Sequence, residues 1–96
     1  MKKMIISAKD CGVDYVKSQK REPKLCLTKE QYDKPYDSPN SFGSTYGEHK
    51  EALEFSEEEW EELFFFAREN RVQLFASVFD EISANFMNEQ GARLFK

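Results

Sequence analysis

The sequence predicts an α/β fold in which parallel strands alternate with helices. Two strand candidates, residues 13–19 and 72–78, flank a helix pattern that begins after Ser56. A second helix pattern and a short apolar segment at residues 93–95 follow. Such alternation is typical of a parallel sheet with right-handed crossovers. Polar side chains stand near the ends of these strands, where α/β barrels carry their active sites.

The composition fits one acidic, aromatic-rich domain. The chain has 96 residues, a net charge of −4 and 15% aromatic residues, a content that argues against disorder. Its acidity and scattered basic residues give no general attraction to nucleic acids or anionic membranes. Its apolar runs fall far short of the roughly 20 residues that span a bilayer, and its start does not form a signal peptide. We therefore expect a cytoplasmic protein with no nucleic-acid and no membrane partner.

The first elements expected are a helix and a strand. Residues 2–11 carry apolar side chains at helical spacing, and Gly12 is suited to end that helix. Cys11 and Cys26 match no zinc spacing and are predicted to be free, buried thiols. Residues 13–19 alternate, so that one face of the strand carries two bulky side chains and then two polar ones: Val13, Tyr15, Lys17 and Gln19.

Residues 20–55 are expected to form a long loop of the kind that serves active sites. Prolines and glycines interrupt any regular element there, and only residues 29–33 favour a short helical turn. Loops of this length in a compact domain are usually functional or disordered. The aromatic residues favour an ordered, packed loop: Tyr32, Tyr36, Phe42 and Tyr46.

The second half of the chain predicts helix, strand and helix. Ser56 and Glu59 form a capping box, and a helical stripe follows that Phe65 and Phe66 widen: Trp60, Leu63, Phe64 and Ala67. That helix is expected to end near Asn70. Residues 72–78 read as a parallel strand buried on both faces. The next helix is expected to start at Asp80 or Ser83, to end at Gly91 and to bury three side chains: Ile82, Phe86 and Met87.

Two lysines at the ends of different strands, Lys17 and Lys96, are the strongest candidates for chemistry. Ammonium groups that converge on one rim would bind phosphate or carboxylate, although a single lysine at a strand end is more often a solvated surface residue. Gln19 could bind a sugar hydroxyl or an amide, or simply begin the loop. Ser77 could contact an anionic ligand or be a packing residue. His49 is the only histidine and is expected to have a structural role, because no partner lies at metal-ligand spacing.

Several uncommon segments resemble the sialic acid synthase (N-acetylneuraminate synthase) family. They are AKDCGVDYVKSQ, KPYDSPNSFGSTYGEHKEALEFSEEEWEEL, FASVFDE and the terminal RLFK, and together they cover essentially the whole chain. The resemblance implies that residues 1–96 are part of a (β/α)₈ TIM barrel, from its first helix to the start of its fourth strand. Exposed strand edges are then expected.

The resemblance also implies a reaction. Members of this family are carbon–carbon bond-forming transferases that condense phosphoenolpyruvate with an N-acetylmannosamine-type sugar, or its 6-phosphate. The product is a sialic or other nonulosonic acid. The family enzymes need a divalent cation, Mn²⁺ or Mg²⁺, and are homodimers.

Site residues follow from the same resemblance. Lys17 and Lys96 match two lysines that contact phosphoenolpyruvate, and Gln19 matches a glutamine that contacts the amino sugar. Ser77 falls in the third-strand motif of the anion site, where this chain has Ser-Val-Phe and many members have Ser-Thr-Pro-Phe. Asn40 aligns with a loop asparagine that touches the sugar in some members.

The family's first-strand signature and its two metal-binding histidines have no counterpart in these residues. We therefore expect no metal ligand and no turnover from the 96 residues alone. Two alternatives stay open. The chain could be a non-catalytic interaction module, or it could be one piece of a split enzyme whose remainder is encoded separately.

Overall fold

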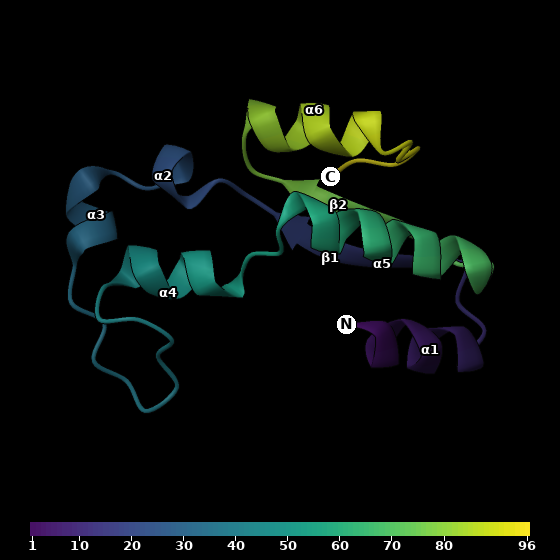
Figure 1. Cartoon of the computed structure of the whole chain (residues 1–96), viewed down its shortest axis with the longest axis horizontal. Coiled ribbons are helices and arrows are strands. Elements are labelled where there is room, and N and C mark those ends of the chain that lie inside the picture. The colour runs from purple at the N-terminus through teal and green to yellow at the C-terminus, as the bar shows by residue number, and fades with distance from the viewer.

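The computed structural model describes residues 1–96, which form six helices and two strands (Figure 1). The elements in chain order are α1 (Lys2–Asp10), β1 (Tyr15–Lys20), α2 (Pro23–Cys26), α3 (Lys29–Asp33), α4 (Tyr46–Leu53), α5 (Glu57–Glu69), β2 (Gln73–Val78) and α6 (Glu81–Glu89). None of the helices has the length and apolarity that crossing a membrane requires.

The two strands pair in parallel, as the alternation of elements predicts. Their register runs from Tyr15 opposite Gln73 to Lys20 opposite Val78. The end of the chain joins β2 on its other side, because Ala76 forms a parallel bridge with Phe95. The predicted start of a further strand is therefore confirmed, and β2 lies between β1 and the terminal segment.

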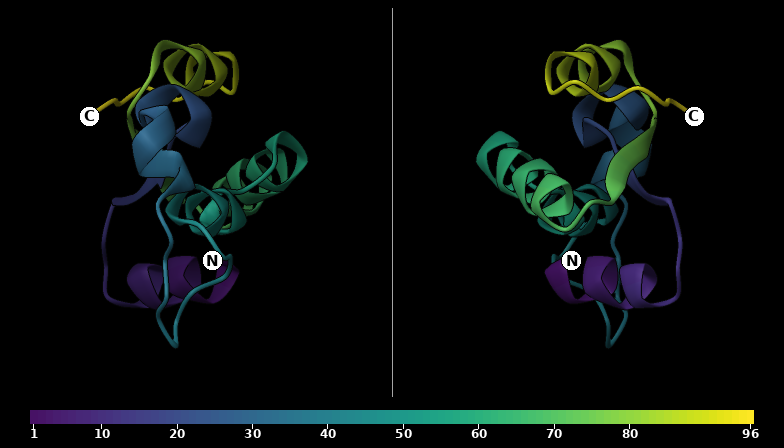
Figure 2. Two further views of the ribbon diagram at one scale, coloured as in Figure 1. Left: turned by 90° about the vertical axis from the view of Figure 1, so that its left-hand side faces the viewer. Right: turned by 90° about the vertical axis from the view of Figure 1, so that its right-hand side faces the viewer.

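One face of this sheet is covered by helices α5 and α6, which lie on the same side of β2 (Figure 2). The predicted stripe of α5 is buried throughout, and Trp60 is completely enclosed. Leu74 and Ala76 supply the β2 side of this core, and α1 adds Ile5 where it packs against α5. The core therefore occupies only one side of the sheet.

Helix α5 forms as its sequence predicts. The hydroxyl of Ser56 accepts a hydrogen bond from the Glu59 amide, and the Glu59 carboxylate accepts one from the Ser56 amide. This reciprocal capping satisfies amides that the first helical turn leaves free. The helix ends at Asn70. Phe65 departs from expectation, because its side chain is 61% exposed.

Helix α6 starts at Asp80, whose carboxylate accepts a hydrogen bond from the Ser83 amide. Gly91 follows its last turn with a φ of +84°, a conformation that favours glycine. Phe86 and Met87 are buried as predicted, but Ile82 is 55% exposed. Position 83 takes the place toward the core instead, and Ser83 is fully buried.

Residues 21–55 are more regular than the sequence suggests. The turn at residues 29–33 is confirmed as α3, but α2 and α4 were not expected. Thr45 and Glu48 form a capping box at the start of α4. Gly47 lies within that helix, and its missing side chain lets the ring of Tyr32 pack against the backbone: a Cβ there would come within 2.2 Å of the ring.

Three further expectations are wrong. The first strand begins at Tyr15 rather than Val13, because Gly12 and its neighbours form the turn that ends α1. Strand β2 is covered on one face, since Gln73 is exposed and Phe75 is only partly buried on the other. Both cysteines are exposed rather than buried, although both are free thiols as predicted.

Candidate functional site

The polar candidates gather on the face of the sheet that the helices leave open. Side chains that pair across parallel strands point to the same side. Because Lys17 pairs with Phe75 and Gln19 pairs with Ser77, all four side chains share one face. Tyr15 begins that face, and its ring meets the Phe75 ring edge-on with 6.2 Å between centroids. The aromatic pair therefore precedes the polar groups along the strands.

Lys17 and Ser77 are in direct contact. The Lys17 ammonium donates a hydrogen bond of 3.3 Å to the Ser77 hydroxyl oxygen. Ser77 is only 9% exposed, so its hydroxyl is held in place while most of the lysine remains accessible to solvent. A fixed hydroxyl beside an accessible ammonium can bind an anion without first being ordered.

Lys96 lies on the other side of Ser77. Its amide donates to the Ala76 carbonyl at 3.4 Å, and its carbonyl accepts from the Val78 amide at 2.9 Å. These two bonds place Lys96 opposite Ser77 in the parallel ladder, on the same face as Lys17. The two strands and the terminal segment thus present Gln19, Ser77 and Lys96 in one row, with Lys17 one pair behind.

Gln19 and Asn40, the two amide candidates, differ in position and in hydrogen bonding. The side-chain oxygen of Gln19 accepts a hydrogen bond of 3.0 Å from the Arg21 guanidinium, which orients the amide at the end of β1. Asn40 lies in the exposed segment between α3 and α4, where its amide donates to the Ser38 hydroxyl. That segment extends away from the strands in Figure 1. The structure therefore does not bring Asn40 to the row formed by the other candidates.

Asp80 fixes the loop that leaves β1. One carboxylate oxygen caps α6, and the other accepts a hydrogen bond of 2.7 Å from the Glu22 amide. Burial pushes the pKa of Asp80 upward, but the amide hydrogen bonds from Ser83 and Glu22 outweigh it and hold the pKa below its usual value. Asp80 is thus the helix cap that the sequence favours. It also accepts a hydrogen bond from the Glu22 amide, which the sequence does not predict.

Charged residues surround this junction. Lys20 is buried, forms an ion pair with Glu22 at 3.6 Å and lies over the Phe86 ring. Arg21 pairs with Glu54 at 3.8 Å and stacks on Phe79, 4.4 Å from the ring centroid. Burial raises the pKa of Glu54 above its usual value. Sequence alone does not indicate that Arg21 anchors segment 21–55, since its partners Glu54 and Phe79 are more than thirty positions away in the chain.

The candidates line an open face and not an enclosed cavity. The three principal cavities of the structure are lined by other residues. No group of three or more histidine, cysteine, aspartate or glutamate side chains is placed to hold a metal ion. His49 stacks on Phe42 and contacts the tilted ring of Tyr36, and its Nδ1 accepts a hydrogen bond from the Phe42 amide. These contacts fit the structural role expected for it.

Sequence comparison identifies the family to which this arrangement belongs. Residues 4–96 match the sequence profile of the NeuB family. The chain belongs to the NeuB family. The profile includes both strands and the terminal segment, and therefore all the candidate residues of the open face.

Curated relatives agree with this assignment to the NeuB family. The N-acetylneuraminate-9-phosphate synthases of Mus musculus and Homo sapiens are each 41% identical to the chain over 95 residues. The synthase of the same name from Drosophila melanogaster is 41% identical over 87 residues. These matches cover 99%, 99% and 91% of this chain but only 26%, 26% and 23% of the relatives. The chain thus spans about a quarter of their length. No solved structure is significantly similar to it.

Proposed function

We propose that this chain supplies part of the substrate site of a sialic acid synthase, within a (β/α)₈ barrel that its sheet would continue. The reaction would join phosphoenolpyruvate to the 6-phosphate of an N-acetylmannosamine-type sugar. The phosphorylated sugar is favoured because the relatives are named for making N-acetylneuraminate 9-phosphate. A three-carbon unit added at the aldehyde end would leave the sugar's phosphate on the last carbon of such a product.

The single observation that carries the proposal is the row of polar side chains on the open face. Phosphoenolpyruvate has two anionic groups, a phosphate and a carboxylate, and ammonium groups bind both. Lys17 and Lys96 flank Ser77 on neighbouring strands, so one lysine could hold each group. Gln19 stands at the end of the same row, where it could bind the sugar's hydroxyl or acetamido group.

The residues would act by position and by charge. Held at both anionic groups, phosphoenolpyruvate would present its methylene carbon to the aldehyde carbon of the sugar, and the new carbon–carbon bond would form there. Water would add to the carbon that carries the phosphate, and inorganic phosphate would leave. The lysines would stabilise negative charge at the phosphate as it departs.

The divalent cation implied by the family resemblance does not fit the residues of this chain. No acidic, thiol or imidazole cluster is placed to ligate it, and the Nδ1 of His49 is already hydrogen-bonded within the loop. We propose that its ligands come from other parts of the longer family enzyme and that the 96 residues alone do not turn over.

A replacement experiment tests the proposal. Residues 4–96 would take the place of the matching quarter of the mouse synthase, and phosphate release from phosphoenolpyruvate would be measured with the phosphorylated sugar. The chimera is expected to be active, and Lys17→Met is expected to reduce its kcat/KM by about 100-fold or more, because the substrate's anionic group would lose its ammonium partner. Lys24→Met, on exposed α2, is the matched control. A Lys17→Met chimera as active as the control would refute the assigned site.

The open edge of β1 favours the split-enzyme alternative in one respect. Strand β1 pairs only with β2, so its outer backbone groups are free to pair with another strand. The homodimer that the family resemblance implies is proposed for the complete barrel and not for these 96 residues alone. The neighbouring DNA decides between the alternatives: if it encodes the missing strands, the chain is a truncated or split enzyme. If it does not, a non-catalytic interaction module is favoured.

A further inference from the structure

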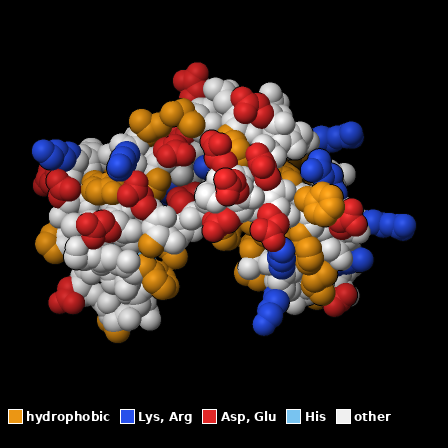
Figure 3. Space-filling view, viewed as in Figure 1, with side chains coloured by type: hydrophobic (Ala, Val, Ile, Leu, Met, Phe, Trp, Pro, Cys, Tyr) orange, Lys and Arg blue, Asp and Glu red, His pale blue; other side chains and the backbone are white.

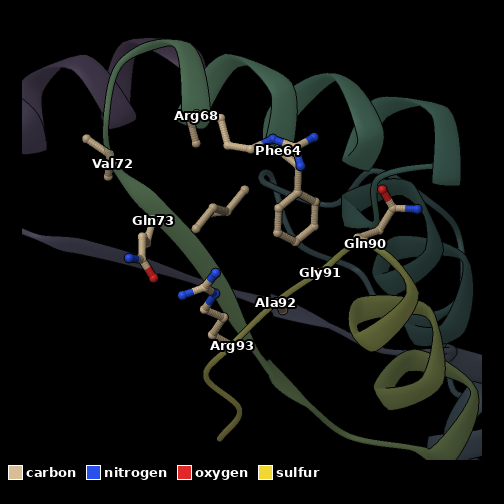
Figure 4. Close-up of a pocket in the computed structure, with 10 residues that line it drawn as sticks. Phe64, Arg68, Val72, Gln73, Gln90, Gly91, Ala92 and Arg93 are labelled. Atoms are coloured by element: carbon tan, nitrogen blue, oxygen red, sulfur yellow. The ribbon is translucent and has the colours of Figure 1, made fainter.

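A second candidate site lies on the helix-covered side of the sheet, at the opposite end of β2 from the lysine row. A groove of about 370 Å³ opens between α5, the start of β2 and the segment that follows α6 (Figure 4). Its volume falls within the range of small-molecule sites, roughly 300–1,000 Å³. It shares no residue with the row of candidates on the open face.

The walls of this groove combine an apolar floor with cationic sides. Five lining residues are hydrophobic, and the Phe64 ring points from α5 toward the segment at Ala92 (Figure 4). Arg68 reaches the groove from α5, and Arg93 reaches it from the segment after α6. Gln73 and Gln90 add amide groups, and no carboxylate lines the groove.

Both arginines are free to bind a ligand. Neither forms an ion pair or stacks on an aromatic ring within the chain. The chain as a whole has a net charge of −4, so two unpaired guanidinium groups at one groove are a local reversal of its charge. Acidic side chains are plentiful on the surface (Figure 3). Two arginines that nevertheless lack an acidic partner therefore indicate a place where an external anion could bind.

We propose that this groove binds a small molecule in which a phosphate or carboxylate is attached to a ring-sized apolar body. The planar guanidinium groups of Arg68 and Arg93 would form paired hydrogen bonds with the anion. The apolar body would lie against the groove wall formed by Phe64, Val72 and Leu74. These side chains are already at most 5% exposed, so binding would remove mainly the ligand's own apolar surface from water. The site does not depend on the proposed synthase activity, because its residues take no part in the lysine row.

Phenyl phosphate is the probe that tests the proposal. It would be titrated into the ¹⁵N-labelled 96-residue chain while the amides of Leu74, Gly91 and Ala92 are followed by NMR. Saturable shifts at these amides are expected. Inorganic phosphate, which lacks the apolar body, and phenol, which lacks the charge, should each bind at least about tenfold more weakly. Benzoate in place of phenyl phosphate distinguishes a carboxylate site from a phosphate site.

Two arginine variants test the groove, and a third serves as their control. Arg68→Gln and Arg93→Gln remove exposed charges, so they should preserve the fold and weaken binding by about tenfold each. Arg71→Gln removes the same charge three positions from Arg68 but outside the groove, and should change affinity by less than about twofold. Lys24→Met, which removes an exposed charge outside the groove, should leave binding unchanged.

Three outcomes would overturn the proposal. The first is the lack of any saturable shift at the groove amides. The second is inorganic phosphate binding as tightly as phenyl phosphate, which would indicate charge alone. The third is an equal loss of affinity in Arg71→Gln and Arg68→Gln, which would indicate general attraction by the surface.

Discussion

The two faces of one small sheet differ in what they contact. On the covered face, Leu74 and Ala76 pack against helices, and their neighbours are almost all apolar. On the open face, the Lys17 ammonium donates to the Ser77 hydroxyl, and Lys96 lies opposite Ser77 on the other side of β2. Along β2 the two kinds of position alternate: Leu74 and Ala76 face the helices, whereas Phe75 and Ser77 face the open side. Alternation therefore lets β2 contribute to the core and to a polar site at the same time.

The difference between the covered and the open face indicates where a binding site can lie in a chain this short. A domain of this size has a small core and little stability to spare, roughly 5–15 kcal/mol. Buried charges without partners would be costly, so polar ligands for an anion are best placed on a face that no helix covers. We expect substitutions on the covered face to change stability and substitutions on the open face to change binding.

The largest effect should come from the centre of the covered face. Trp60→Ala removes a fully buried side chain and should lower the free energy of unfolding by about 3–5 kcal/mol. Tyr15→Ala, at the half-exposed start of the open face, should cost about 1 kcal/mol or less. Urea unfolding followed by circular dichroism measures both. Equal losses would mean that the open face is as much a part of the core as the covered face.

Adjacent residues of β2 give a sharper comparison. Ala76 is 1% exposed beneath the helices, so Ala76→Leu should overpack the core and lower the free energy of unfolding by about 1–3 kcal/mol. Ser77→Ala keeps the backbone and removes only the hydroxyl with its hydrogen bond to Lys17, and should change that free energy by about 1 kcal/mol or less. The same unfolding assay applies. A larger cost for Ser77→Ala would make Ser77 a packing residue.

Asp80 joins the covered side to the loop that leaves β1. Asp80→Ala should lower the free energy of unfolding by about 1–2 kcal/mol, because α6 loses its cap and the Glu22 amide loses its acceptor. Asp80→Asn can still cap α6 and should cost less. Thermal unfolding monitored by circular dichroism compares the three proteins.

The same residue predicts a pH dependence. The folded-state pKa of Asp80 lies below its ordinary value of 3.8, so the stabilisation is present above that value. It is lost as the pH falls through the lowered pKa. The difference in stability between the wild type and Asp80→Asn should therefore shrink in acid. A difference that stays constant from neutral pH into that acid range would exclude the ionised carboxylate as its source.

The smallest change in stability is expected for Lys17→Met. The Lys17 side chain is exposed, and its hydrogen bond to Ser77 is a surface contact, so the free energy of unfolding should change by about 0.5 kcal/mol or less. Chemical unfolding of the two proteins side by side measures this. A loss comparable to that of Ala76→Leu would show that Lys17 holds the fold together.

Much of this architecture could be predicted from local sequence. The Ser56–Glu59 capping box and the stripe from Trp60 to Ala67 depend only on spacing, so α5 was predicted from its start to its end at Asn70. Parallel pairing followed from the alternation of elements. Helix α4 was missed although Thr45 and Glu48 carry the same capping pattern, because Gly47 suggested a break in the helix.

The remaining features depend on tertiary contacts. Periodicity indicates which residues share a helix face but not how far a neighbour covers it, so Phe65 and Ile82 were wrongly placed among the packed residues. The contact between Lys17 and Ser77 depends on the strand register, which no local pattern specifies. Arg21 and Asp80 hold segment 21–55 through partners that are distant in sequence.

The central claim is that Lys17 and Lys96, on either side of Ser77, bind one anionic ligand together. Titration of the chain, labelled with ¹³C and ¹⁵N at lysine, with phosphoenolpyruvate tests it most directly. We predict that the side-chain signals of Lys17 and Lys96 shift with one shared midpoint, that Ser77→Ala weakens the response, and that Lys24 and Lys29 do not respond. Shifts of equal size at all four lysines, or different midpoints for Lys17 and Lys96, would contradict the account.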